Sequence, residues 1–289
     1  MPLQSRVRRS LRSNRNAASL AWVGCAAAAW TVFGLVAAAG SPFDRQRFNE
    51  FVTMRAGDGS RPVYWYCTGE MRSFPEGKTV VMLEGLGSDR LVRDARDPNL
   101  AYQLHREIFI YRDPATGHVV RELDGMPVIP IAMPYQLVTY RLAGTDLEVF
   151  VEQGSGERLA KLGPLSVAVR QAASGAVYSV PLFVQRQGAA FAHYDYFFDA
   201  AGHHRVSWIR FDDWVRPPAS TRRVMHAVCS RESRFEDLPA TIREYVEREA
   251  PQFKEPPRDI EEIRRLQKGP GQTPEARPAG PKFLPTSLP

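Results

Sequence analysis

Short runs of alternating apolar and polar residues occupy most of the chain between positions 63 and 229. They are rich in Val, Tyr, Phe, Trp and Thr, and turn signals such as Asp113-Pro114-Ala115-Thr116-Gly117 and Ala201-Gly202 separate them. A period of two with this composition predicts strands. The predicted strands are 63–67, 79–83, 108–111, 119–120, 137–141, 147–151, 165–169, 177–180, 191–198, 205–211 and 224–229.

About ten short strands in one domain predict a mainly β fold. A sheet of this size must roll into a barrel or split into two layers, because its edges and its apolar face have to be covered. We therefore expect an antiparallel, barrel-like or strongly curled sheet. Barrels of this size are able to hold a small ligand.

Helical spacing is found on both sides of the strand region. After the start signal Ser41-Pro42, a helix is predicted over 44–57. A second helix is predicted over 241–249 and a short third one over 260–266. The apolar positions that set the spacing are Phe48, Phe51 and Val52 in the first helix and Ile242, Tyr245 and Val246 in the second.

The first 39 residues have the composition of an export signal. Residues 1–16 carry five arginines and no acid, and residues 20–39 are uncharged, Ala-rich and end on three alanines. The pair Arg8-Arg9 fits a twin-arginine signal. A signal anchor that stays in the membrane is the alternative, because about 20 apolar residues span a bilayer. Both interpretations place the rest of the chain in the periplasm or another extracytoplasmic space.

Charge outside this leader is nearly balanced. The chain has 38 Lys and Arg against 32 Asp and Glu, so removing the five leader arginines leaves 33 against 32. This excludes the basic surface that nucleic-acid binding requires. From Pro251 onward, nine prolines in 39 residues predict a segment that cannot bury enough apolar surface to fold. We expect one β-rich domain over 44–253, then a largely disordered Pro-rich tail over 254–289 whose protein partner the sequence does not identify.

Two cysteines, Cys67 and Cys229, remain in the predicted domain after the leader is set aside. An oxidising compartment would allow a disulfide between them. We favour two separate buried thiols, which are common core residues. No Cys or His spacing resembles a zinc site, and no nucleotide, hydrolase or metalloprotease motif is present, so neither a metal nor a cofactor is expected.

Four sequence blocks resemble one bacterial family. The region from about Phe51 to Pro257 is similar to domain of unknown function 1838, and YRDPATG is the most specific block, whereas 121–134 departs from the family pattern. The resemblance implies an exported β-rich protein and assigns no catalytic residue. The blocks are Val63-Tyr64-Trp65-Tyr66-Cys67-Thr68-Gly69, Leu83-Glu84-Gly85, Tyr111-Arg112-Asp113-Pro114-Ala115-Thr116-Gly117, and Val224-Met225-His226 leading to Glu236-Asp237-Leu238-Pro239.

Glu84 is the sharpest candidate for chemistry, because it lies in an apolar run just before a predicted Gly85-Leu86-Gly87 turn. A buried, unpaired carboxyl has a raised pKa, which suits general acid or base catalysis. An ion pair with an inward arginine is the alternative. We expect Glu84 to face the interior, within hydrogen-bonding reach of at least one of Tyr64, Tyr66, Arg106, Arg112, Tyr194 and His226.

The run Phe191–Phe198 offers two alternative sites. Alternation places His193 and Asp195 on one face, as an oriented base, and Tyr194 and Tyr196 on the other, as donors to a carbonyl or enolate oxygen. Only one of the two faces can look inward. A half-exposed polar face over an aromatic core is the alternative without a function.

Further candidates are single residues. His226 lies among valines, so we expect it to be partly buried, either as a core residue or as a base. Aromatic residues would line a ligand pocket or simply form the core. The predicted ligand contacts are Tyr64, Trp65, Tyr66, Arg106, Arg112, Tyr196 and Trp208.

These features favour an exported β-barrel-like protein that encloses a lipophilic small molecule. Cofactor-free acid/base chemistry, as in an isomerase or lyase, is one open interpretation. A non-catalytic carrier or sensor of hydrophobic ligands and a structural envelope protein are the alternatives. Contact with a membrane is expected only through the N-terminal segment.

Overall fold

The computed structural model describes residues 41–123, 126–128, 130–153, 157–185, 189–211 and 222–268. The chain divides into two units, residues 1–39 and 40–289, and every described residue belongs to the second. The predicted leader and the part of the Pro-rich tail after residue 268 lie outside the described residues.

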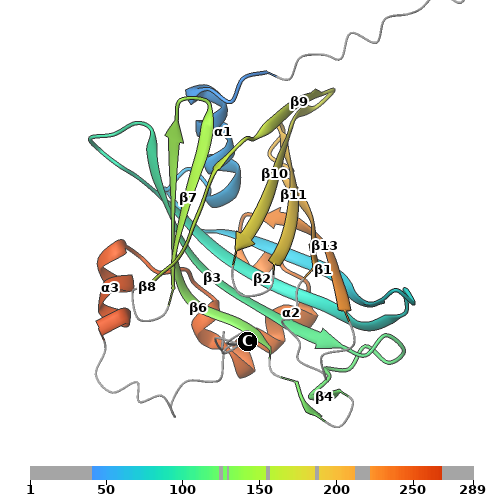
Figure 1. Cartoon of the computed structure of the whole chain (residues 1–289). Coiled ribbons are helices and arrows are strands. Elements are labelled where there is room, and N and C mark those ends of the chain that lie inside the picture. The colour runs from blue at the N-terminus through green and yellow to red at the C-terminus, as the bar shows by residue number, and fades with distance from the viewer. Residues whose placement is uncertain are drawn as a thin grey trace, which may run out of the picture. The chain divides into compact units, whose positions relative to one another are not determined.

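Eleven strands form one antiparallel sheet in the order β8-β7-β6-β3-β2-β1-β13-β12-β11-β10-β9 (Figure 1). Within the described residues the sheet curls without closing, and β10 lies beside β8 but does not pair with it. The predicted strongly curled, mainly β fold is confirmed. The strands are β1 (Val63–Phe74), β2 (Thr79–Arg93), β3 (Leu100–Arg112), β6 (Ile131–Ala143), β7 (Asp146–Gln153), β8 (Glu157–Leu165), β9 (Ala168–Ala172), β10 (Gly175–Gln185), β11 (Ala189–Asp199), β12 (Arg205–Phe211) and β13 (Arg222–Glu232), with a separate pair formed by β4 (Glu122–Leu123) and β5 (Met126–Pro127).

Two predicted strands are wrong. The run 119–120 forms only a bridge from Val119 to Arg112, because Asp113 closes a tight turn by accepting the backbone N–H groups of Ala115 and Thr116. The run 165–169 is the end of β8 followed by the start of β9.

The central strands also extend further than the apolar pattern predicts. β2 continues through Gly85 and Gly87 to Arg93, so the predicted turn at these glycines is wrong. Gly85 pairs with Phe109 of β3, and a Cβ atom at Gly85 would lie 2.4 Å from the Phe109 ring. Glycine is needed there because the neighbouring aromatic ring occupies the space of a side chain.

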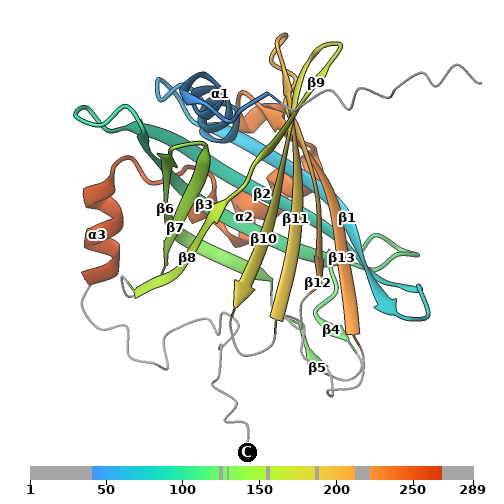
Figure 2. The same cartoon turned by 45° about the horizontal axis from the view of Figure 1, so that its top comes forward.

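Helix α1 (Arg45–Ala56) lies against the concave side of the sheet (Figure 2). Its first turn is capped by Asp44, whose carboxylate accepts the backbone N–H of Arg47 at 2.9 Å. The Phe51 ring makes edge-on contacts with Tyr140 of β6 and Tyr196 of β11. The helix predicted over 44–57 is confirmed, and it packs between two distant parts of the sheet.

The opposite face of the sheet is covered by the C-terminal elements: η1 (Phe235–Asp237), α2 (Ala240–Glu249), η2 (Pro251–Phe253) and α3 (Ile260–Lys268). Ile242 and Val246 of α2 are fully buried, and Ile263 of α3 packs against Leu104 and Leu137. Both predicted C-terminal helices are confirmed. Because α3 packs on the sheet, the packed structure continues past the domain end expected at residue 253.

Cys67 of β1 and Cys229 of β13 form a disulfide, with their Cα atoms 4.0 Å apart. The preferred prediction of two separate thiols is therefore wrong. The two cysteines face each other in the β1–β13 register, across 162 residues of sequence. The alternation of apolar and polar residues within each strand does not show which distant strands become neighbours, so it could not predict this disulfide.

Candidate functional site

The sheet divides the predicted site residues between its two faces. On the concave face lie Trp65, Tyr194, Tyr196 and Trp208. On the other face, Glu84, Tyr64, Tyr66, Arg106 and Arg112 contact the C-terminal covering elements. The predicted residues therefore do not converge on a single site.

A buried polar network joins β2, β3 and β6 on the concave face. Asp89 is fully buried, and its Oδ1 accepts hydrogen bonds from His105 Nδ1 at 2.6 Å and Gln103 Nε2 at 2.5 Å. The Tyr140 hydroxyl donates to Gln103 Oε1 at 2.5 Å. The second carboxylate oxygen, Asp89 Oδ2, is buried with no hydrogen-bond partner among the described residues. The network thus contains an acceptor that is not used within this part of the chain.

The surroundings of His105 favour the charged form of its imidazole. Burial alone would lower the pKa of its imidazole, but the Asp89 carboxylate more than offsets this effect and raises the pKa to about 9. Its Nε2 lies 3.5 Å from Glu107 Oε2, so both ring nitrogens face a carboxylate. An imidazolium held in this way is oriented as a proton donor.

Arg55 of α1 adds a second cation beside the network. Its guanidinium carbon lies 5.2 Å from the centre of the Tyr196 ring and 5.7 Å from that of Trp65. Burial opposes the charge, but Tyr196, Tyr140 and Asp89 hold the pKa of Arg55 above its ordinary value. Cation–π contacts of this kind hold a guanidinium in an aromatic environment.

Four aromatic rings pack against one another on the same face of the sheet. Tyr194 and Tyr196 are stacked with centroids 5.8 Å apart, and Trp208 is tilted against Tyr194 at 6.4 Å. Phe109 meets Trp208 edge-on at 5.8 Å. Burial raises the pKa of the Tyr196 phenol, which therefore stays protonated and able to donate a hydrogen bond.

On the opposite face, Glu84 is buried and paired. Its Oε2 accepts from Arg112 Nε at 2.5 Å, and its Oε1 accepts from Thr241 Oγ1 at 2.6 Å and from the Tyr66 hydroxyl at 3.1 Å. Burial and Glu84 together raise the pKa of Tyr66 to about 12. The expectation that Glu84 faces the interior beside Tyr66 or Arg112 is confirmed. Its contacts are those of an ion pair that fixes the first turn of α2, and a catalytic role stays a prediction.

Two other predicted ligand contacts fasten the C-terminal segment. Arg106 donates to the backbone oxygens of Gln252 and Glu255 at 2.5 and 3.0 Å, and the Tyr64 hydroxyl donates to the Glu255 carboxylate at 3.1 Å. Each side chain therefore ties the covering layer to the sheet.

His193 and Asp195 do form a pair, at 3.3 Å, on the outward face of β11. Their side chains are 35% and 30% exposed, and the Ser179 hydroxyl also donates to Asp195. The predicted alternation is confirmed, and it is the tyrosines that face inward. This surface pair is separated from the Asp89–His105 pair by the sheet.

His226 is exposed and lies 3.3 Å from the Ser207 hydroxyl. The expected partial burial is wrong, because Met225 and Ala227, its neighbours in sequence, are the inward residues of β13. The valines on the same face as His226 are themselves partly or largely exposed.

Sequence reasoning missed the residues of the concave network. It ended the strand of Asp89 at residue 83 and began the strand of His105 at residue 108. The signal that could identify them is the placement of Gln103, His105 and Glu107 at every second residue, with Leu104, Arg106 and Ile108 on the other face, directly before the apolar run.

Among the described residues, the helices are too short or too polar to cross a bilayer. The same residues contain no group of three or more His, Cys, Asp or Glu side chains that would hold a metal ion.

No family model and no curated protein matches the chain. A proposed AttH from Nitrosomonas europaea aligns with 16% identity over 59% of this chain and 50% of its own length, with a TM-score of 0.18. A DUF1329 family protein from Desulfovibrio piger aligns with 9% identity over 67% of this chain and 92% of its own, with a TM-score of 0.23. The chain thus spans about half the length of the first of these structures, and TM-scores this low do not define a shared fold.

Proposed function

We propose that this protein is exported and binds a lipophilic small molecule against the concave face of its sheet, where the Asp89–His105 pair transfers protons. The reaction class is a cofactor-independent isomerisation or elimination. A non-catalytic carrier or sensor of hydrophobic ligands is the second candidate.

The buried Asp89–His105 pair is the observation that carries the proposal. Transferring a charged pair from water into a protein interior costs several kcal/mol per ion, and apolar replacements are often neutral or stabilising. Ionised groups in an apolar environment therefore mark a candidate functional site. Here both side chains are buried, on the same face of the sheet as Trp65, Tyr196 and Trp208.

The groups present suit proton transfer. His105 is charged at neutral pH and acts as the acid, and the second oxygen of Asp89 acts as the base. Tyr196 keeps its proton and donates to the oxygen of a carbonyl or enolate. In an isomerisation Asp89 takes a proton from one carbon, His105 gives one to another carbon, and passage of a proton from Asp89 to His105 restores both groups. In an elimination the proton from His105 goes to the leaving group instead.

The carrier is favoured by the packed rings of Tyr194, Tyr196 and Trp208, since aromatic rings bind apolar surface without any chemistry. The two candidates differ in what they require of Asp89 and His105. A carrier keeps its ligand when the charged pair is replaced by leucines, whereas an enzyme loses turnover.

Native mass spectrometry of the protein purified from its own host, followed by assay of the released ligand, tests the proposal. We expect a co-purifying lipophilic molecule and at least about a hundredfold loss of turnover in Asp89→Asn and His105→Gln. His193→Gln and Asp195→Asn change the same residue types on the outer face and serve as controls. Absence of any ligand, together with a less stable Asp89→Leu/His105→Leu variant, would show that the pair is only structural.

Export is supported by the arginine-rich leader and by the Cys67–Cys229 disulfide, because disulfides persist in oxidising compartments. Fractionation should find the protein outside the cytoplasm, with less exported when Arg8 and Arg9 are both changed to Lys. Unchanged export of that variant would remove the twin-arginine route, and full retention of the wild type in the cytoplasm would remove export itself.

A further inference from the structure

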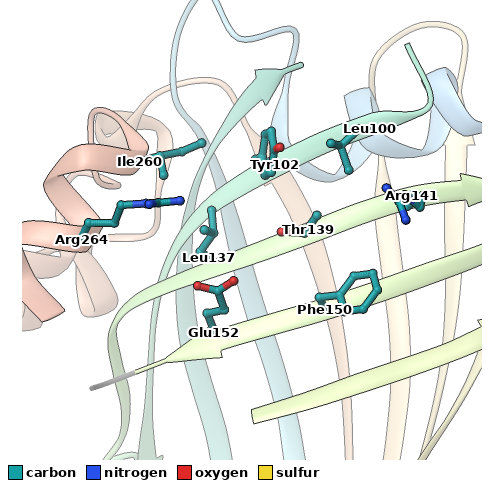
Figure 3. Close-up of a pocket in the computed structure, with 9 residues that line it drawn as sticks. All are labelled: Leu100, Tyr102, Leu137, Thr139, Arg141, Phe150, Glu152, Ile260 and Arg264. Atoms are coloured by element: carbon teal, nitrogen blue, oxygen red, sulfur yellow. The ribbon is translucent and has the colours of Figure 1, made fainter. Parts of the chain in front are cut away.

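We propose that a groove beside α3 binds a small amphipathic carboxylate, such as a medium-chain fatty acid. The groove has a volume of about 360 Å³ and lies between α3 and strands β3, β6 and β7 (Figure 3). It is on the face of the sheet opposite the Asp89–His105 pair, because Thr139 lines it while the adjacent Tyr140 joins the concave network. The inference is therefore independent of the proposed function.

The floor of the groove suits an apolar chain. Leu100, Leu137, Phe150 and Ile260 line it from three strands and the start of α3 (Figure 3). Leu137 is only 3% exposed, so the floor is continuous with the core beneath α3. Small-molecule sites are mostly apolar, with a few polar groups that fix orientation.

Two arginines supply those polar groups. Arg141 and Arg264 lie on opposite sides of this floor (Figure 3). Burial and Asp94 raise the pKa of the Tyr102 phenol, while both arginines oppose that rise, so both charges act near the middle of the groove. A guanidinium binds a carboxylate through two parallel hydrogen bonds.

The acidic groups nearby are already engaged. Glu152, which also lines the groove, has an interaction partner of its own. The Asp94 carboxylate accepts the Tyr102 hydroxyl and the backbone N–H groups of Arg96 and Asp97. Two arginines and one glutamate line the groove, so their formal charges sum to +1, which favours a carboxylate over a neutral or cationic head.

The wall of the groove is fixed before any ligand arrives. Ile263 of α3 is fully buried, Glu262 pairs with Arg106 at 3.3 Å, and the Tyr135 hydroxyl donates to the Leu266 backbone oxygen at 3.4 Å. Because α3 is held at three points, binding does not have to order it first.

Calorimetric titration of the full chain with dodecanoate tests the site. We expect saturable binding that weakens about tenfold in Arg141→Gln and in Arg264→Gln, and that weakens similarly when dodecanol replaces dodecanoate. Arg265→Gln removes an exposed charge from the same helix outside the groove and should leave binding unchanged. Arg264→Lys keeps the charge but loses the two parallel hydrogen bonds, so it should weaken binding less than Arg264→Gln does.

Three results would overturn the inference. The first is wild-type affinity for dodecanoate in the Arg141→Gln and Arg264→Gln variants. The second is loss of binding in Asp89→Asn, which would move the amphiphile to the concave face. The third is binding to phosphatidylglycerol vesicles without binding to free dodecanoate, which would identify a membrane surface as the partner.

Discussion

Single residues on the concave face carry charge where a sheet interior ordinarily holds apolar groups. Asp89 and His105 form a buried pair, and each depends on its partner, because removing one leaves a buried charge that has lost its main partner. Arg55 is held in a different way, by aromatic rings and by the oxygens of nearby tyrosines. The charged groups thus form one coupled unit.

His105 should make stability depend on pH. Its pKa rises from 6.5 to about 9 on folding, so its contribution is fully present below about pH 6.5 and is lost as the pH rises through 9. At about 1.4 kcal/mol per pKa unit the loss is at most about 3 kcal/mol. Urea unfolding between pH 6.5 and 9.5 measures it, and His105→Gln should flatten the profile.

His204, whose pKa is lowered on folding, does not affect the change in stability between pH 6.5 and 9.5. Burial lowers the pKa of His204 to about 4, so His204 reduces stability only as the pH falls below about 6.5. The exposed His226 provides the control, since His226→Gln should leave the slope above pH 6.5 unchanged. A His105→Gln profile that keeps the wild-type slope would contradict the assignment.

Glu84→Gln should lower the free energy of unfolding by about 3 kcal/mol, because it leaves Arg112 without its buried partner. Thr241→Val removes only one neutral donor to the same carboxylate and should cost about 1 kcal/mol. Thermal and urea unfolding measure both variants. If Glu84→Gln abolishes turnover at full stability, Glu84 is catalytic and not a structural ion pair.

Among the elements, β2 contains a position, Gly85, at which the structure leaves no room for a side chain. Gly85→Ala would place a Cβ atom 2.4 Å from the Phe109 ring, whereas Gly87→Ala meets only ordinary contacts, the nearest at 3.4 Å. We expect Gly85→Ala to destabilise by about 1 to 3 kcal/mol and Gly87→Ala by less than about 1 kcal/mol. Urea unfolding of the two variants gives the comparison, and equal losses would show that the Phe109 ring moves aside.

The elements differ in how far the sequence predicts them. Helices α1 and α2 follow from start signals and apolar spacing, because both features are local. The ends of β2 and β3 do not, since Asp89, Gln103 and His105 are polar residues on an inward face and look like the end of an apolar strand. The polar candidates that sequence does identify, Glu84 and His193, face away from that network.

At the scale of the whole molecule, the first and last long strands meet in the middle of the sheet. β1 pairs with β13 along its length, and the Cys67–Cys229 disulfide joins them. Neither the pairing nor the bond is visible in local patterns, because both depend on which distant strands become neighbours. The same pairing brings together two groups of strands, one within residues 63–165 and the other within residues 168–232.

The disulfide should contribute substantially to stability. Replacing both cysteines by serine should lower the free energy of unfolding by about 2 to 5 kcal/mol, because the bond restricts a long loop in the unfolded chain. Unfolding of the wild type with and without reductant checks the same quantity. Equal stability of the oxidised wild type and the double serine variant would show that the bond adds nothing.

Strand β13 also determines when, during synthesis, the sheet can be completed. A ribosome that has reached residue 221 has already produced both groups of strands, yet β1 and β12 are still bare edges with no partner between them. Bare edges recruit other chains, and pairings between distant residues form slowly. The eleven residues of Arg222–Glu232 therefore complete the sheet. A chain truncated before them would contain two separate groups of strands, each with an exposed edge that can pair with other chains.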